Sequence, residues 1–251
     1  MELKEFFSEH PRAALAFSGG VDSAYLLYAG LQYAEDLGVY YVRSAFQPAF
    51  EAADAQRLAD SLGAKLHILP LDVLACARVV ENPPDRCYYC KQIIMASILR
   101  AAAADGYPVL LDGTNASDDP GDRPGVRALK ELGVLSPLRL CGLSKAEIRR
   151  RSREAGLFTW DKPAYACLAT RVKSGERITA ETLRAVEEGE SALFALGFTD
   201  FRVRTSGGSA LVQLRREQLD EGRERWKEIE AALSPWFVSA ALDEQGREAR
   251  E

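Results

Sequence analysis

The sequence predicts an α/β protein in which a doubly wound parallel sheet is followed by a small C-terminal α/β domain. Over residues 1–160, short apolar runs alternate with segments of helical spacing, a pattern typical of parallel strands joined by right-handed crossovers. The first apolar run breaks into a glycine turn that leads directly into a helix. Beyond residue 178 the pattern changes to one helix, two strands, a second helix and a last strand. These three observations carry the fold prediction.

The elements of the first domain follow from apolar spacing and from the residues that end each run. The run at 13–17 has the composition of a buried parallel strand, and 22–37 carries an apolar helical stripe. Ser144, with Glu147 three residues later, matches a capped helix start. The remaining expectations are a helix within 1–12, strands at 39–44, 66–69, 109–112 and 134–138, helices at 48–62, 72–82, 92–104, 126–132 and 144–156, and a surface loop at 113–125.

A boundary follows at 159–175, where two tight-turn signals occur and periodicity is weak. Beyond it we expect a helix at 180–196, strands at 201–205 and 210–214 joined by a turn at 206–209, a helix at 218–233 and a strand at 236–242. The predicted organisation is therefore a first domain at 1–160, a connecting loop at 161–178, and a small substrate or oligomerisation domain at 179–251.

Composition narrows the function classes. The chain of 251 residues is 47% hydrophobic and 27% charged, as in an ordinary globular protein. It has no run approaching the roughly 18 apolar residues of a membrane span. The charged N-terminal segment lacks the apolar core of a signal peptide, which predicts a cytoplasmic location. A net charge of −5 argues against a broad nucleic-acid surface.

The glycine turn at 18–23, Ser-Gly-Gly-Val-Asp-Ser, is a predicted anion site. Its glycines let the backbone approach phosphate oxygens, and the free amides of the following helix point toward them. Asp22 is suited either to cap that helix or to hold a magnesium ion. The loop is not of the Walker type, because no lysine follows Gly20.

Placed directly after the first strand, this motif resembles the PP-loop of the ATP pyrophosphatase superfamily. The resemblance implies a HUP-like fold and cleavage of ATP between its α and β phosphates. It also implies adenylation of a carbonyl or carboxylate, followed by displacement of AMP by a nitrogen or sulfur nucleophile.

Cysteines form the second feature. Cys87 and Cys90 lie three residues apart, in a loop before a helix whose positive end favours thiolates. A thioredoxin-like redox pair is an alternative, although such a pair normally opens a helix directly after a strand. Cys167 lies in the boundary loop, and three thiolates suit an iron–sulfur cluster with one open iron better than a closed zinc site. Cys76 and Cys141 lie in apolar settings that suggest packing roles.

Five segments together resemble the LarE family, the sulfurtransferases that thiolate pyridinium-3,5-biscarboxylic acid mononucleotide during assembly of the nickel-pincer nucleotide cofactor. The similarity runs over essentially the whole chain. The segments are 18–23, 112–115, 123–132, 167–171 and 201–204.

The resemblance implies that a substrate carboxylate attacks the α phosphate of ATP, and that sulfur at Cys167 then attacks the acyl carbon. It places ATP, with Mg²⁺, on Ser18, Gly19, Gly20, Val21, Asp22 and Ser23, with the adenine near Ser44 and Gly113. It places the substrate phosphate at Arg202 and Arg204, with Glu190 near the same site. From the residues alone, a solvated strand face is the better interpretation of Arg202 and Arg204.

Cys87 and Cys90 distinguish this chain from family members that use a single cysteine and sacrifice its sulfur. By resemblance, Cys87, Cys90 and Cys167 bind a [4Fe-4S] cluster that carries an extra sulfide. The family also implies a homo-oligomer, and the source of the sulfide stays open. Three alternatives are a PP-loop tRNA thiolase, a non-catalytic nucleotide-binding module and an amidotransferase-type synthetase, which would need a glutaminase domain that the chain lacks.

Overall fold

The structure, a computed structural model, describes residues 1–118 and 124–248. Arg123, the first residue of the segment at 123–132 that carries part of the family resemblance, lies outside the described residues. The chain forms two compact units. Unit 1 comprises Met1–Val73 and Asp85–Lys162, and unit 2 comprises Leu74–Pro84 and Pro163–Glu251.

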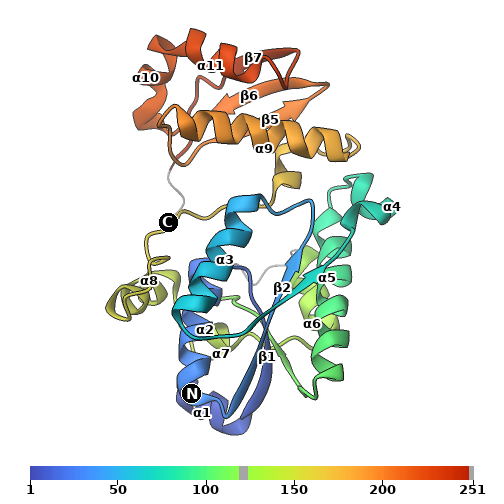
Figure 1. Cartoon of the computed structure of the whole chain (residues 1–251), viewed down its shortest axis with the longest axis vertical. Coiled ribbons are helices and arrows are strands. Elements are labelled where there is room, and N and C mark those ends of the chain that lie inside the picture. The colour runs from blue at the N-terminus through green and yellow to red at the C-terminus, as the bar shows by residue number, and fades with distance from the viewer. Residues whose placement is uncertain (119–123, 249–251) are drawn as a thin grey trace. The chain divides into compact units, whose positions relative to one another are not determined.

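Unit 1 is built on a parallel sheet with the strand order β3-β2-β1-β4 (Figure 1). The central strand is β1, and its Leu15 pairs with Val39 on one side and Leu111 on the other. The predicted α/β class with a parallel sheet is thereby confirmed. The strands are β1 Arg12–Ala16, β2 Asp36–Arg43, β3 Leu66–Pro70 and β4 Leu110–Leu111.

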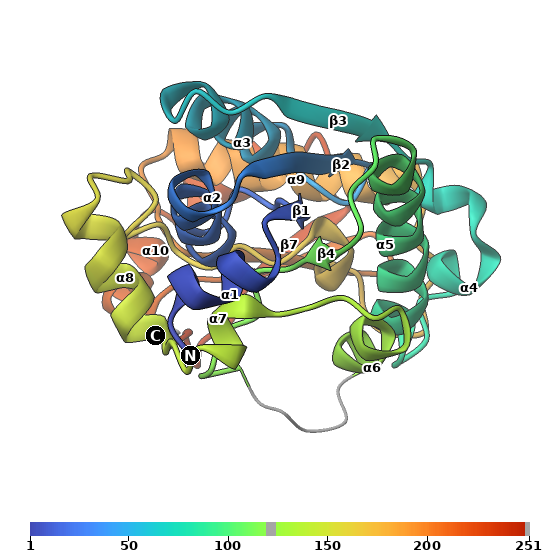
Figure 2. The ribbon, with the colours of Figure 1, turned by 90° about the horizontal axis from the view of Figure 1, so that it is seen from below.

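Helices cover both faces of this sheet, because β1 is apolar at successive positions. Leu15 belongs to the core shared with α1 Leu3–Glu9 and α2 Val21–Tyr33, whereas Ala14 belongs to the core shared with α5 Arg86–Ala104. Figure 2 shows α1 and α2 on one side of the sheet and α5 on the other. The other helices of unit 1 are α3 Ala49–Ser61, α6 Pro124–Glu131, α7 Pro137–Leu140 and α8 Lys145–Glu154.

Unit 2 contains a three-stranded sheet with the order β5-β6-β7 (Figure 1). The β5–β6 hairpin turns at Gly207 and Gly208, whose φ angles of 56° and 79° suit a primed turn. Strand β7 pairs with β6 in parallel. The strands are β5 Arg202–Ser206, β6 Ser209–Gln213 and β7 Ser239–Leu242, and the α-helices are α4 Ala77–Val80, α9 Ala180–Ala195, α10 Leu219–Glu224 and α11 Trp226–Leu233. The 3-10 helices are η1 Val73–Ala75, η2 Leu168–Arg171 and η3 Arg216–Gln218. The first of these, η1, begins at the last residue of unit 1.

Four expectations for single elements were wrong. The strand expected at 134–138 is one bridge between Leu111 and Leu135, because Pro137 starts α7. The expected loop at the cysteine pair is helical, since α5 begins at Arg86. The helix expected at 218–233 is interrupted at Arg225. The helix expected at 72–82 is reduced to η1 and α4.

The segment Leu74–Pro84 groups with unit 2, although the sequence placed it in the first domain. Buried Asn82 has a positive φ of 53°, and its side-chain amide donates to the carbonyl oxygens of Val172 and Lys173. The amides of Gly175 and Ile178 also donate to carbonyls of this segment. Among the described residues, no helix is both long enough and apolar enough to cross a membrane.

Candidate functional site

The anion loop of unit 1 joins β1 to α2 and depends on a glycine at its first turn. Gly19 has a φ of 76°, a conformation that favours glycine, and a Cβ there would lie 3.1 Å from the Cβ of Ala55 in α3. The Ser23 hydroxyl donates to the Gly20 carbonyl at 3.0 Å and lies 3.0 Å from the Ser18 hydroxyl. The loop is therefore tied together by its own serines, and α2 begins within it, at Val21.

Ser18, Ser44 and Gly113 follow the carboxyl ends of three strands, β1, β2 and β4. These strands are parallel, and β1 lies between the other two, so the three residues share one edge of the sheet. In parallel α/β sheets ligands bind at that edge. Gly113 also touches the first turn of α2, since a Cβ there would lie 2.9 Å from the Ser23 amide nitrogen.

The segment after β4 is held in place by buried polar contacts. The Asp112 carboxylate accepts hydrogen bonds from the hydroxyls of Ser136 and Thr114, both at 2.6 Å. The Arg139 guanidinium donates to the Asn115 carbonyl at 3.3 Å. Asp112 and Asn115 are thus structural supports that fix the position of Gly113 beside the anion loop.

Asp22 is the acidic residue of the anion loop, at this edge of the sheet. Its Oδ2 atom accepts a hydrogen bond of 2.6 Å from the Lys145 ammonium. Its Oδ1 atom is buried and has no hydrogen-bond partner among the described residues. Burial raises the pKa of Asp22, and the charge of Lys145 opposes that rise. An unsatisfied carboxylate oxygen is a suitable ligand for Mg²⁺, so this atom fits the predicted ion.

The cysteine pair lies within the first five residues of α5. Cys87 and Cys90 are three residues apart and so are neighbours on one helix surface. Cys87 is exposed, and its Sγ lies 3.9 Å from Nη2 of Arg86. The positive helix end and this guanidinium both favour thiolates. The pair therefore fits two cysteine ligands of the predicted cluster.

Cys167 belongs to unit 2, whereas Cys87 and Cys90 belong to unit 1. Its carbonyl accepts hydrogen bonds from the amide and the hydroxyl of Thr170, which fixes the start of η2. In the part of the chain that the structure describes, no three His, Cys, Asp or Glu side chains form a metal-binding group. The three-cysteine site therefore stays a prediction. Cys76 and Cys141 are half-buried, and burial raises the pKa of the Cys141 thiol.

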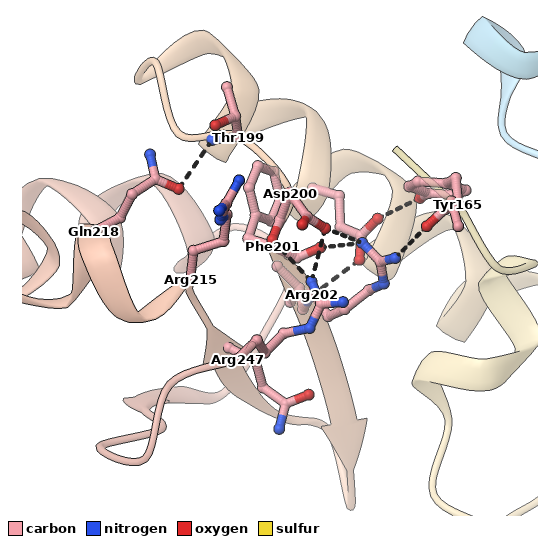
Figure 3. Close-up of polar contacts among 12 residues, drawn as sticks. Tyr165, Thr199, Asp200, Phe201, Arg202, Arg215, Gln218 and Arg247 are labelled. Carbon is pink, nitrogen blue, oxygen red and sulfur yellow. Dashed lines mark hydrogen bonds and ion pairs between the residues drawn. The ribbon is translucent and has the colours of Figure 1, made fainter. Parts of the chain in front are cut away.

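Unit 2 contains a strongly basic pocket of about 860 Å³. Arg202 is buried, and its guanidinium donates to the Ala164 carbonyl at 2.7 Å, while Arg204 donates to the Gln213 side chain at 2.6 Å. Figure 3 shows Arg202 and Arg247 beside Asp200 and Tyr165. The pocket is lined by five arginines, namely Arg171, Arg202, Arg204, Arg216 and Arg247.

Among the described residues, the five arginines of this pocket pair with three carboxylates, those of Asp200, Glu190 and Glu248. Burial, together with the nearby charges of Arg171 and Arg247, lowers the pKa of Arg202 to about 10. Asp200 lies 3.7 Å from Arg202 and 3.1 Å from Arg247 and is shared between them. A bound anion would relieve the repulsion among the guanidinium groups, and arginine forks match phosphate oxygens. The pocket is therefore suited to a phosphate group.

Glu190 is a buried carboxylate that fixes one arginine of this pocket. Glu190 and Arg171 are each only 2% exposed, and their charged atoms lie 2.6 Å apart. The Tyr165 hydroxyl and the Val203 amide also donate to the Glu190 carboxylate. Glu190 thus positions Arg171, and it is not among the residues that line the pocket.

Sequence reasoning missed three arginines of this pocket. Arg171 ends the segment at 167–171 that the family resemblance had already singled out, so a signal was available. Arg216 and Arg247 stand in segments without a recognisable motif, and only the fold brings them to the β5–β6 sheet.

Comparisons with known proteins agree with these features. No protein-family model matches the chain. It is 39% identical over 223 residues to an uncharacterized protein of Synechocystis sp., covering 87% of this chain and 82% of the relative. It is 31% identical over 205 residues to the pyridinium-3,5-bisthiocarboxylic acid mononucleotide synthase of Lactiplantibacillus plantarum, covering 81% of this chain and 74% of the relative. The tRNA-specific 2-thiouridylase MnmA of Corynebacterium urealyticum is 29% identical over 186 residues, covering 61% of this chain and 46% of the relative.

Proposed function

Because the chain belongs to the LarE family, the family of the L. plantarum pyridinium-3,5-bisthiocarboxylic acid mononucleotide synthase, we propose that it is an ATP-dependent sulfurtransferase of nickel-pincer cofactor biosynthesis. Its substrate is pyridinium-3,5-biscarboxylic acid mononucleotide, and its product carries a thiocarboxylate in place of a carboxylate. The observation that carries this proposal is the Ser-Gly-Gly-Val-Asp-Ser loop at the carboxyl edge of the parallel sheet, in a chain with 31% identity to that synthase.

ATP binds to unit 1 in this scheme. The glycines and the amides at the start of α2 contact its phosphates, and Ser44 and Gly113 flank its adenine. Asp22 Oδ1 holds Mg²⁺, which neutralises charge on the phosphates when bound. The basic pocket of unit 2 binds the 5′-phosphate of the mononucleotide through Arg202 and Arg204, with Arg171 fixed by Glu190.

The reaction has two steps. A carboxylate oxygen of the substrate attacks the α phosphorus, the bond to the bridging oxygen breaks, and pyrophosphate leaves with that oxygen. The carboxylate oxygen, a poor leaving group on its own, can then leave as part of AMP, which is a good leaving group. A sulfur nucleophile at Cys167 then attacks the acyl carbon, and AMP leaves with the electron pair of the carbon–oxygen bond.

The source of the sulfur divides the proposal into two variants. If Cys167 gives its own sulfur, its Cβ–S bond breaks, the Cα proton is lost, and dehydroalanine remains. In the variant that we favour, Cys87, Cys90 and Cys167 hold a [4Fe-4S] cluster, which when bound supplies a sulfide for transfer. The helical cysteine pair supports this second variant, since both thiols lie at the positive end of α5. A cytoplasmic, homo-oligomeric enzyme is part of the same proposal.

The test uses anaerobically prepared protein, ATP, Mg²⁺ and the pyridinium mononucleotide. We expect AMP, pyrophosphate and a thiocarboxylate product, with several products per chain and an unchanged mass at Cys167. One product per chain, with loss of hydrogen sulfide from Cys167, would select the sacrificial variant. Colourless protein without iron would exclude the cluster. Thiolation of tRNA instead of the mononucleotide would support the function that the MnmA similarity offers as an alternative.

A further inference from the structure

Lys145 is the one basic residue of the described chain that forms an ion pair with the anion loop. It is the first residue of α8, whose start is capped by the Ser144 hydroxyl. The backbone amide of Lys145 donates to the Ser117 hydroxyl at 2.9 Å, which fixes the point where its side chain leaves the helix. The side chains of Lys145 and Asp22 are only 21% and 22% exposed. The ammonium is therefore held at one place beside the loop.

The loop itself supplies no positive charge. Cleavage of ATP between the α and β phosphates collects negative charge on the departing pyrophosphate, and phosphate-binding loops of the Walker type meet such charge with their own lysine. Here Ser18–Ser23 contains no lysine or arginine. A basic side chain that meets this charge must therefore come from outside the loop, and Lys145 lies beside it.

We propose that Lys145 is the residue that binds the β and γ phosphates of ATP and stabilises the pyrophosphate as it leaves, with Asp22 holding the ammonium in place. This inference rests on the proposed ATP-dependent function and assigns the charge partner of its leaving group.

The hydrogen bonding of Lys145 allows this role. An ammonium group has three N–H donors, and among the described residues Nζ of Lys145 makes one hydrogen bond, to Asp22 Oδ2. Two donors are left for phosphate oxygens without breaking the ion pair. The other oxygen of the same carboxylate, Asp22 Oδ1, has no hydrogen-bond partner among the described residues and suits Mg²⁺. A single carboxylate can thus place two positive charges, one from lysine and one from the metal ion, at the phosphate tail.

The competing interpretation is that Lys145 only neutralises Asp22. The two roles differ in what they do to ligands of different phosphate content. A lysine that contacts the β and γ phosphates contributes to binding of ATP and pyrophosphate but not of AMP. A lysine that only stabilises the loop affects all three ligands alike.

The experiment is isothermal titration of the full-length protein with Mg²⁺·ATP, Mg²⁺·pyrophosphate and AMP. For Lys145→Met we expect affinity for ATP and pyrophosphate to fall roughly 10- to 100-fold, the usual worth of a hydrogen bond to a charged group. AMP affinity should stay unchanged. Lys65→Met is the matched control, because Lys65 is exposed and lies just before the amino end of β3, at the opposite edge of the sheet. It should alter none of the three affinities.

A second pair of variants controls for misfolding of the loop in Lys145→Met. Lys145→Met leaves the Asp22 carboxylate without its partner, which can unfold the loop. Comparing Asp22→Asn with the double variant Asp22→Asn, Lys145→Met removes that problem, since neither contains the carboxylate. The double variant should again lose ATP and pyrophosphate affinity relative to Asp22→Asn.

The failures are distinguishable. Wild-type protein that binds ATP, together with an unchanged ratio of ATP to AMP affinity in both comparisons, would overturn the role of Lys145 and leave the proposed function standing. Wild-type protein that binds neither ATP nor pyrophosphate would overturn the proposed function and this inference with it.

Discussion

The anion loop of unit 1 and the basic pocket of unit 2 are built in opposite ways. The loop at 18–23 is contiguous in sequence and presents backbone amides at the start of one helix. The pocket collects arginine side chains from η2, β5 and the segments that follow β6 and β7. One site depends on places where a side chain must be absent. The other depends on side chains whose charges need buried partners.

This difference predicts how each region fails. A backbone site is lost when a Cβ intrudes, as at Gly19 or Gly113, whereas replacing its neighbours has smaller effects. A pocket of arginines is lost when a supporting carboxylate such as Glu190 is removed, because a buried cation without a partner is strongly unfavourable. Substitutions in the two regions should therefore differ in the ligand whose binding they weaken.

The largest effect is expected for Cys167→Ala. Without the thiol no sulfur reaches the acyl carbon, so the thiocarboxylate product should disappear completely. Substrate-dependent exchange of labelled pyrophosphate into ATP should continue, because the loop of unit 1 is intact. Cys141→Ala, at a half-buried cysteine outside both sites, is the control and should keep product formation. Product from Cys167→Ala would contradict the assignment.

The next largest effect is expected for Glu190→Gln. The change leaves the Arg171 guanidinium buried without its counter-charge, which typically costs about 3–5 kcal/mol. Chemical denaturation should show this loss of stability, together with weaker binding of inorganic phosphate. Glu188→Gln, half-buried on the same helix, should change stability by less than about 0.5 kcal/mol. Equal stability of the two variants would mean that Glu190 does not support the pocket.

The same contrast explains what the sequence can predict. The parallel α/β fold is predictable because β1 is apolar at successive positions, so both faces must be covered, and the structure confirms this. The prediction of a strand at 134–138 was wrong, because Pro137 begins a helix and only Leu135 pairs with β4. An apolar run of this length is compatible with either conformation.

Site residues follow the same rule. The loop at 18–23 is visible in sequence because its parts are neighbours along the chain. Lys145 lies 123 residues from Asp22, and no local pattern predicts their ion pair. That Glu190 lies near the substrate phosphate stays a prediction, and its contacts with Arg171, Tyr165 and Val203 are visible only in the fold. Contacts between distant segments depend on tertiary packing, which composition and periodicity do not contain.

An intermediate effect is expected for Gly113→Ala. The new Cβ would lie 2.9 Å from the Ser23 amide nitrogen, so α2 or the segment after β4 must shift. We expect a loss of about 1–3 kcal/mol in unfolding free energy and weaker ATP binding. Gly125→Ala is the matched control, because its Cβ would meet only ordinary contacts with the Lys91 side chain and a helix favours alanine. If both variants bind ATP equally well, the close approach at Gly113 has no bearing on the nucleotide.

The smallest effect is expected for phosphate-induced stabilisation of the basic pocket. An anion that binds only the folded protein raises its stability by about 2.7 kcal/mol at a hundredfold excess over Kd. Inorganic phosphate should therefore raise the melting temperature of the wild-type protein, and Arg202→Gln should reduce this rise because it removes a buried fork from the pocket. Lys227→Gln, on α11 and outside the pocket lining, should respond like the wild type. If Arg202→Gln keeps the full response, phosphate binds elsewhere, and the pocket of unit 2 would lose its role as the side-chain counterpart of the backbone site in unit 1.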